Sequence, residues 1–409
     1  MAARWLIATL VCGCLAAPRA NAYSVLSHEA IIDAAWDTPG TSIRALLLAR
    51  FPGASEDELR KAHAYAYGGS IIQDMGYYPF GSHLFSDLVH YIRSGDFILN
   101  EIAGAQDLNE YAFALGSLAH YAADNIGHPA ATNLAVPMLY PKVRRKFGQR
   151  ATYEDNPADH LKAEFSFDVA EVAEHHFAPQ GYHDFIGFEV SKPLLERAFL
   201  KTYGVPLRDV ASTVDLSLGS YRHSVATIIP EMTRVAWKEK QKELMKATPG
   251  LTKRKFVYAM ERSSYEKEWG TDYGKPGPWA RFLAFLFELL PKVGPLRALT
   301  FHVPTAATQK LFMDSFVKSL AAYQAQLGAI GAKQAPGLAN TNFDTGAPSK
   351  FGDDKMADEA CGKLLIKLRE HKFEGVDADL RRGLLDYYGN AMPVDAKAAE
   401  ALALLRTQQ

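Results

Sequence analysis

The stretch LAHYAADNIGHP, residues 118–129, carries three polar side chains, His120, Asp124 and His128, in an otherwise apolar segment. Residues four apart lie on one face of a helix, so His120 and Asp124 point the same way, and His128 follows where a Gly and a Pro end the helix. A polar side chain inside an apolar element costs a few kcal/mol unless a partner satisfies it. The segment therefore has to pack against groups that satisfy two imidazoles and a carboxylate.

Most of the remaining chain has the pattern of helices. Apolar residues recur at helical spacing over long segments, and runs with the alternation of a strand are scarce. We predict an all-α fold, in which a multi-helix domain is followed by a helical insertion and a C-terminal helical extension. The segments with helical periodicity are 28–36, 41–50, 56–67, 110–126, 158–176, 191–202, 209–245 and 308–330.

The predicted main domain covers residues 23–235, and a helical accessory region follows over 236–330. Residues 331–356 have the composition of a linker or loop, and 357–409 form a C-terminal helical segment. Within the accessory region, residues 278–299 are strongly apolar but too few to span a membrane. We favour a buried helix there, and a lid or a peripheral membrane contact is the alternative.

The first 22 residues, MAARWLIATLVCGCLAAPRANA, have the pattern of a secretory signal peptide. An early Arg4 precedes an apolar stretch, and Ala-Asn-Ala supplies a cleavage site. We expect cleavage near Ala22, which makes Tyr23 the first mature residue and the protein secreted or periplasmic. Acidic and basic residues balance at a formal net charge of -1, so no stable nucleic-acid partner is expected from charge.

A second pair of histidine and carboxylate repeats the four-residue interval, at His160 and Glu164 in DHLKAEF. One such pair on a helix is usually an ordinary hydrogen-bonded pair. Two pairs, together with other histidines and aspartates beside apolar segments, favour a site for several metal ions, because imidazole and carboxylate are zinc ligands. The other candidates are His28, Asp74, His83, Asp87 and His90.

Other catalytic motifs are absent from the sequence. His28-Glu29 lacks the second histidine of an HExxH zinc protease, and no Gly-x-Ser-x-Gly nucleophile elbow occurs. The Glu-x-x-His pairs of a di-iron bundle are missing, as are a P-loop and a Gly-rich dinucleotide motif. A metal-dependent chemistry is therefore the one that the residues favour.

These residues resemble the zinc-dependent phospholipase C and S1/P1 nuclease superfamily, whose members are all-α enzymes with three clustered zinc ions. Within it, the likeness is greatest to the N-terminal domain of glycosylphosphatidylinositol-specific phospholipase D and its bacterial relatives, which share the short interval between Asp124 and His128. The matching stretches come in the family's order over about residues 23–190: SHEAII, AYGGSIIQDMGYYPFGSHLFSDLVHYIRSGDF, ALGSLAHYAADNIGHP and DHLKAEFSFD.

The resemblance implies one site of three zinc ions. The implied ligands fall into three sets: Tyr23, through its free amine and carbonyl, with His28 for the first zinc; Asp74, His83 and His120 for the second, with Asp124 bridging it to the first; and His128, His160 and Glu164 for the third. The family usually has Trp where this chain has Tyr23. His83 is preferred to His90, because GSH followed closely by Asp87 fits the ligand position better.

The resemblance also implies roles around the metals. Asp74 and Asp124 are the expected catalytic residues, since Asp124 bridges two metals and Asp74 can orient the attacking water as well as bind metal. Asp87, Asp168 and Tyr121 are candidates to fix imidazole tautomers, and they are equally well explained as structural residues.

The leading interpretation is an exported zinc-dependent phosphodiesterase, a phospholipase C-like hydrolase that releases phospholipid head groups through hydroxide activated by several zinc ions. An S1/P1-type nuclease or 3′-nucleotidase is the alternative, because YSVLSH also resembles the start of those enzymes. A non-catalytic, zinc-stabilised protein that binds lipid or a cell-surface partner is a third interpretation, of another class. The full set of ligand side chains argues against it.

Overall fold

The computed structural model describes residues 24–78, 80–174, 188–211, 214–225 and 301–407, with single positions at 237, 241, 242 and 245. Over these residues the regular structure is helical apart from β1 and β2, a two-residue antiparallel pair, which confirms the all-α prediction. The elements are α2 (Val25–Trp36), α3 (Ile43–Arg50), α4 (Glu56–Ile71), the 3-10 helix η1 (Ile72–Tyr77), α5 (His83–Tyr91), α6 (Ser94–Gly104), α7 (Leu108–Gly127), the π-helix η2 (His128–Thr132), α8 (Asn133–Leu139), α9 (Pro141–Phe147), α10 (Pro157–Glu174), α12 (Lys192–Tyr203), α13 (Leu207–Val210), α14 (Val214–His223), α19 (Ala306–Gly331), β1 (Thr341–Asn342), β2 (Ala347–Pro348), α20 (Lys355–Glu370), α21 (Ala378–Tyr388) and α22 (Ala396–Thr407).

Most helices begin where a short polar side chain caps the first free backbone N–H groups. Ser55 and Glu58 form a reciprocal capping box at the start of α4, and Asp107 accepts the backbone N–H of Glu110 at the start of α7. The C-terminal helical segment is divided at residues 371–377, where Lys372 and Phe373 have positive φ, so α20 and α21 are separate helices.

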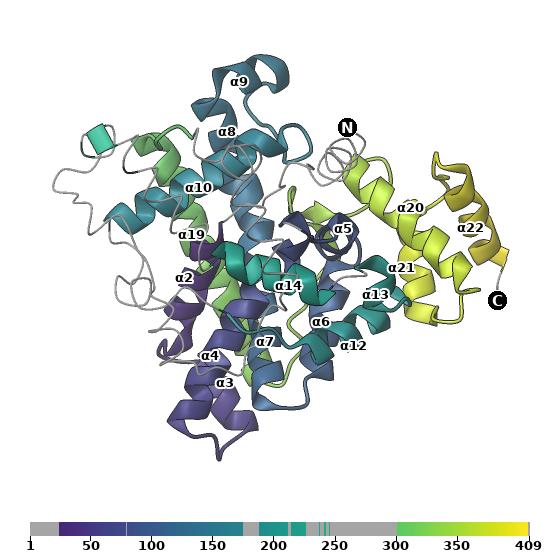
Figure 1. The fold of residues 1–409 in the computed structure, drawn as a ribbon, viewed down its shortest axis with the longest axis horizontal. Helices are drawn as coiled ribbons and strands as arrows, with labels where there is room; N and C mark the ends of the chain where they lie inside the picture. The colour runs from purple at the N-terminus through teal and green to yellow at the C-terminus, as the bar shows by residue number, and fades with distance from the viewer. Residues whose placement is uncertain are drawn as a thin grey trace, which may run out of the picture.

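Helices α4 and α7 pack so closely that glycine is required at their crossing. A Cβ atom on Gly69 would lie 1.9 Å from the carbonyl oxygen of Phe113, and one on Gly116 would lie 2.0 Å from that of Ala66. Both distances are far below van der Waals contact, so only glycine allows the two backbones to meet. In Figure 1 the two helices lie next to each other with α2 beside them.

The C-terminal part of the chain belongs to the same hydrophobic core as the N-terminal part. Helix α19 lies against α7, where the Tyr323 hydroxyl donates to the carbonyl of Leu115 at 2.8 Å, and α20 packs on α5. Figure 1 shows α20, α21 and α22 together at one side of the molecule. The division predicted at residue 235 therefore does not separate two cores, because α19 buries its apolar face on the helix that carries His120.

Two predicted segments lie outside the described residues: the signal peptide at 1–22 and the apolar segment at 278–299. In the part of the chain that the structure describes, no helix combines the length and the apolar character needed to cross a membrane.

Candidate metal centre

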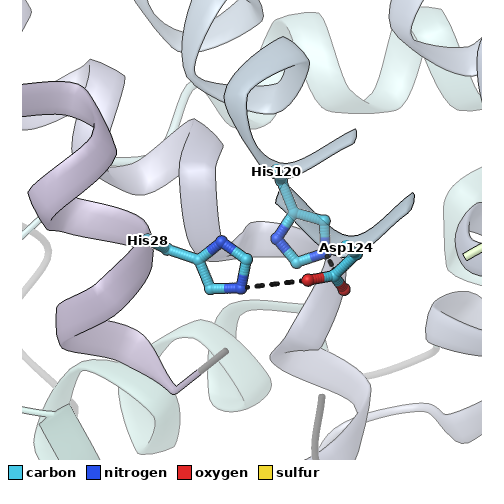
Figure 2. A group of neighbouring side chains, drawn as sticks. All are labelled: His28, His120 and Asp124. Carbon is cyan, nitrogen blue, oxygen red and sulfur yellow. Dashed lines mark ion pairs between the residues drawn. The ribbon is translucent and has the colours of Figure 1, made fainter. Parts of the chain in front are cut away.

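Helices α2 and α7 bring the first group of ligands together (Figure 2). His28 Nε2 lies 3.5 Å from Asp124 Oδ1, and His120 Nε2 lies 3.2 Å from Asp124 Oδ2. The two imidazole rings stack, with their centroids 4.4 Å apart. Asp124 thus directs Oδ1 toward His28 on α2 and Oδ2 toward His120 on its own helix. The four-residue interval on α7 predicts the contact with His120.

A second group joins His120 to η1 and α5. His90 Nε2 and His120 Nε2 lie 3.4 Å and 3.6 Å from Asp74 Oδ1, and the two Nε2 atoms are 3.3 Å apart. Asp124 Oδ2 is 3.7 Å from His90 Nε2, so this carboxylate also faces the second group. Two groups of candidate ligands therefore share one face of α7.

The structure gathers His90 with Asp74 and His120 in the second group, whereas the sequence analysis preferred His83 as the ligand. His83 begins α5 and is partly exposed, whereas His90 is buried near the end of that helix. The two residues are seven apart, so they lie on one face of α5 but roughly 10 Å apart along its axis. Only the C-terminal end of α5 reaches the cluster.

A third group collects His128 from η2, His160 from α10 and Asp344 from the loop between β1 and β2. His128 Nδ1 lies 3.1 Å from Asp344 Oδ1, and its Nε2 lies 3.8 Å from Asp124 Oδ2. Glu164, one turn after His160, places Oε1 3.7 Å from His160 Nδ1. Asp344 was not among the residues expected from the sequence, because it falls in the segment interpreted as a linker.

The structure places the other expected residues as follows. Tyr23 lies outside the described residues, and its successor Ser24 is the residue before α2. Asp168 accepts the backbone N–H groups of Leu26 at 3.0 Å and Ser27 at 3.1 Å, so it fixes the start of α2 rather than an imidazole tautomer. The Tyr121 hydroxyl donates to the carbonyl of Ala339 at 2.9 Å, beside the loop that carries Asp344.

Backbone carbonyls set the tautomers of three histidines. A carbonyl oxygen only accepts, so the ring nitrogen facing it carries the proton and leaves the other nitrogen's lone pair free. Nδ1 of His120 donates to Ser70, Nδ1 of His90 donates to Ser86, and Nε2 of His160 donates to Ala151, each at 2.8 Å. The free nitrogens are Nε2 of His120 and His90 and Nδ1 of His160, the atoms that face the three groups.

Burial and neighbouring charges shift the pKa values of the cluster residues in the absence of bound cations. Burial, reinforced by His120, lowers the pKa of His28 to about 3, whereas Asp124 and Asp74 overcome burial and raise the pKa of His120 to about 9. Burial, followed by the charge of Asp124, holds the pKa of Glu164 well above its usual range. Several buried ligand atoms make no hydrogen bond: Asp74 Oδ1, both oxygens of Asp124, His160 Nδ1, both oxygens of Glu164 and Asp344 Oδ1.

Such orphaned nitrogens and carboxylate oxygens are the ligand types that Zn²⁺ takes. The donor set therefore fits bound zinc, which would satisfy atoms that the protein leaves without partners. All nine residues of the three groups, Glu164 included, are at most 3 % exposed: His28, Asp74, His90, His120, Asp124, His128, His160, Glu164 and Asp344.

Residues 27–213 match the family described as zinc dependent phospholipase C. This segment is a zinc-dependent phospholipase C family domain. The family consists of phosphodiesterase hydrolases that use three zinc ions, and the structure holds three buried groups of candidate ligands. The phospholipase C domain includes every expected ligand from His28 to Glu164, whereas Asp344 lies beyond its matched end. No curated protein and no solved structure matches the chain.

Proposed function

We propose that this chain is an exported phospholipase C-like enzyme that hydrolyses the phosphodiester linkage of a phospholipid and releases its head group. The position of Asp124 carries this proposal, with one oxygen 3.5 Å from His28 and the other 3.2 Å from His120. A carboxylate held between two sets of imidazoles suits the bridge of a two-metal site, in which the ions stand roughly 3.5–4 Å apart.

The residues of the chain divide the work of this site. His28, with the amine of Tyr23, would hold one zinc, and Asp74, His90 and His120 would hold the second. Bound zinc supplies a Lewis acid that makes water a nucleophile near neutral pH and neutralises the charge on the phosphate oxygens. Asp124 would contribute one carboxylate oxygen to each of the two metals, and Asp74 would orient a water for attack on phosphorus.

Export is part of the proposal because the first metal position depends on processing. The signal-like sequence at residues 1–22 and the Ala-Asn-Ala site support cleavage before Tyr23. Cleavage there would create a free amine on Tyr23, one residue ahead of Ser24. Ser24 directly precedes α2, the helix that carries His28. A chain extended at this end has no such amine, so we expect it to bind the first zinc poorly.

Three features support a phospholipid as the substrate. The family match names phospholipase C, and the short interval between Asp124 and His128 is that of the phospholipase D-like branch. The apolar stretch at 278–299 and the sequence before it at 234–268, which is rich in lysine and arginine, have compositions that suit a peripheral contact with an anionic lipid surface. These features favour the lipid over a nucleic acid.

The test uses the mature chain that starts at Tyr23, with any tag at the C-terminus. Vesicles of phosphatidylcholine or of phosphatidylinositol and, separately, single-stranded DNA are incubated with it, and the water-soluble phosphorylated products are identified. The proposal predicts release of a phosphorylated head group. Chelation should abolish this release, and added zinc should restore it. Cleavage of DNA without any lipid turnover would instead establish a nuclease, and turnover of neither substrate would leave a binding protein.

A further inference from the structure

The third group of ligands contains a carboxylate that the phospholipase C domain itself does not supply. Asp344 belongs to the loop between β1 and β2, beyond the matched residues 27–213, and its side chain is 2 % exposed. We propose that Asp344 is a direct ligand of the third zinc, so that the C-terminal part of the chain completes the metal centre. This inference rests on the zinc centre of the proposed function.

The contact between Asp344 and His128 has the geometry of two ligands of one metal. Asp344 Oδ1 and His128 Nδ1 are 3.1 Å apart, and neither atom has any hydrogen-bond partner apart from the other. Two atoms bound to one tetrahedral zinc through bonds of roughly 2.0–2.2 Å stand about 3.3–3.6 Å apart, so a small shift of either side chain would admit the ion. The same three-residue group includes His160, whose Nδ1 is likewise without a hydrogen bond.

Hydrogen bonds to the rest of Asp344 fix the orientation of its Oδ1 atom. Asp344 Oδ2 accepts the backbone N–H of Tyr153 at 2.8 Å, which leaves Oδ1 facing His128. The backbone N–H of Asp344 donates to Asn342 Oδ1 at 2.9 Å, and its carbonyl accepts from Asn133 Nδ2 at 2.8 Å. The residue is therefore held from three sides, and its free oxygen is oriented before any metal binds.

The neighbouring Phe343 fastens the same loop to the second group. Its backbone N–H donates to the carbonyl of His90 at 3.1 Å, and its buried ring packs edge-on against the rings of His90 and Tyr121. The loop thus touches two of the three groups, and a metal bound by Asp344 would link residues after 340 to the helices before 165.

The donor atoms of the third group indicate the role that its zinc would have. His128, His160, Glu164 and Asp344 offer two nitrogens and two carboxylates, which neutralise Zn²⁺ and complete a tetrahedral shell. A zinc held by four protein ligands would be closed and would stabilise structure rather than activate water. The third zinc therefore ties the β1–β2 loop to the phospholipase C domain.

The substitutions Asp344→Asn and Asp344→Ala separate a ligand from a hydrogen-bonding neighbour. Asparagine can accept the Tyr153 backbone N–H with its one amide oxygen and donate from its amide N–H₂ to His128 Nδ1, but its neutral amide is a poor zinc ligand. The full mature chain is dialysed against a graded series of chelator, and bound zinc per chain is measured by mass spectrometry. Asp353→Ala, on the exposed part of the same loop region, is the matched control.

We expect both variants to fall from three zincs to two at chelator concentrations where the wild-type chain and Asp353→Ala keep three. The weakest-held zinc should lose more than the roughly 10–100-fold in affinity that an outer hydrogen-bond partner costs. Amide hydrogen exchange over residues 340–348 should rise in both variants and match that of the zinc-free wild type.

If Asp344→Asn keeps three zincs and only Asp344→Ala weakens one of them, Asp344 is a hydrogen-bonding neighbour and the inference is wrong. A wild-type chain that binds no zinc would overturn the proposed function as well. Melting of the zinc-free proteins controls for folding, because Asp344→Asn removes one charged partner of the buried contact with His128 and should lower stability even without metal.

Discussion

His120 donates its Nδ1–H to the carbonyl oxygen of Ser70 at 2.8 Å, across the contact between α7 and α4. The neighbours of these two residues include the glycines that let the helices meet, Gly69 on α4 and Gly116 on α7. The bond fixes the ring orientation and tautomer that leave Nε2 free for metal. The geometry of the metal centre is therefore coupled to the closest helix packing in the core.

This coupling predicts that Gly69→Ala damages both stability and zinc binding. The added methyl group would lie 1.9 Å from the carbonyl oxygen of Phe113, so the helices must separate, at a cost of about 1–3 kcal/mol or more. Gly328→Ala in α19 is the control, because nothing lies within 4 Å of its Cβ and it should stabilise by up to about 1 kcal/mol. Urea unfolding and zinc content check both variants; equal stability of the two would contradict the account.

Substitutions of His90 and of His83 test which of the two histidines is a ligand at the second metal position. We expect His90→Ala to lose one zinc and with it phosphodiesterase activity, because His90 Nε2 lies 3.4 Å from Asp74 Oδ1. His83→Ala, two turns earlier on α5, should keep three zincs. Zinc counting and a lipid hydrolysis assay measure this, and the opposite pattern would restore the assignment made from the sequence.

Asp168 should act on the first metal position through the start of α2. Asparagine at this site keeps one acceptor oxygen but turns an amide N–H₂ toward the backbone N–H of Leu26 or Ser27. We predict that Asp168→Asn lowers the free energy of unfolding by about 1–3 kcal/mol and weakens the zinc at His28 by roughly 10–100-fold. Chelator competition tests this; loss of stability with unchanged zinc affinity would limit Asp168 to a structural role.

Glu101 should make the stability depend on pH. Burial raises the pKa of its carboxyl from 4.5 to about 8, although Ser117 and His120 act in the opposite direction. The folded state binds this proton more tightly than the unfolded state, so stability falls as the pH rises from about 4.5 to about 8. Glu101→Gln removes this loss, and its melting temperature should match the wild type near pH 5 and exceed it at pH 9.

The expected gain at pH 9 is on the order of 2–5 kcal/mol, because one pKa shift of several units is involved. Comparing the two proteins at each pH cancels the titration of groups that both contain. A gain of the same size at pH 5 and pH 9 would show that the Glu101 carboxyl does not titrate between them.

The features that the sequence predicts well are local ones. His120 and Asp124 share a helix face because of a four-residue interval, and the same argument pairs His160 with Glu164. The preference for His83 over His90 rested on the GSH stretch followed by Asp87, and periodicity cannot distinguish the two because seven residues also return to the same face. What separates them is depth along α5, which depends on how that helix packs.

The contribution of the C-terminal part could not be read from local pattern. Asp344 lies in a stretch with the composition of a linker, and it meets Asn133 across 211 positions of sequence. Nothing near it in the chain indicates a ligand, because its partners are Tyr153 and His128 on distant elements. The backbone carbonyls that orient the histidines could not be predicted from the sequence either, because every residue has a carbonyl group.

Anomalous X-ray diffraction from crystals of the mature chain, recorded on both sides of the zinc absorption edge, tests the central claim most directly. The account predicts three zinc peaks, each within about 2.0–2.2 Å of ligand atoms. One should lie between His28 and Asp124, one among Asp74, His90 and His120, and one beside His128. An empty cluster, or a single peak, would contradict a three-zinc phosphodiesterase.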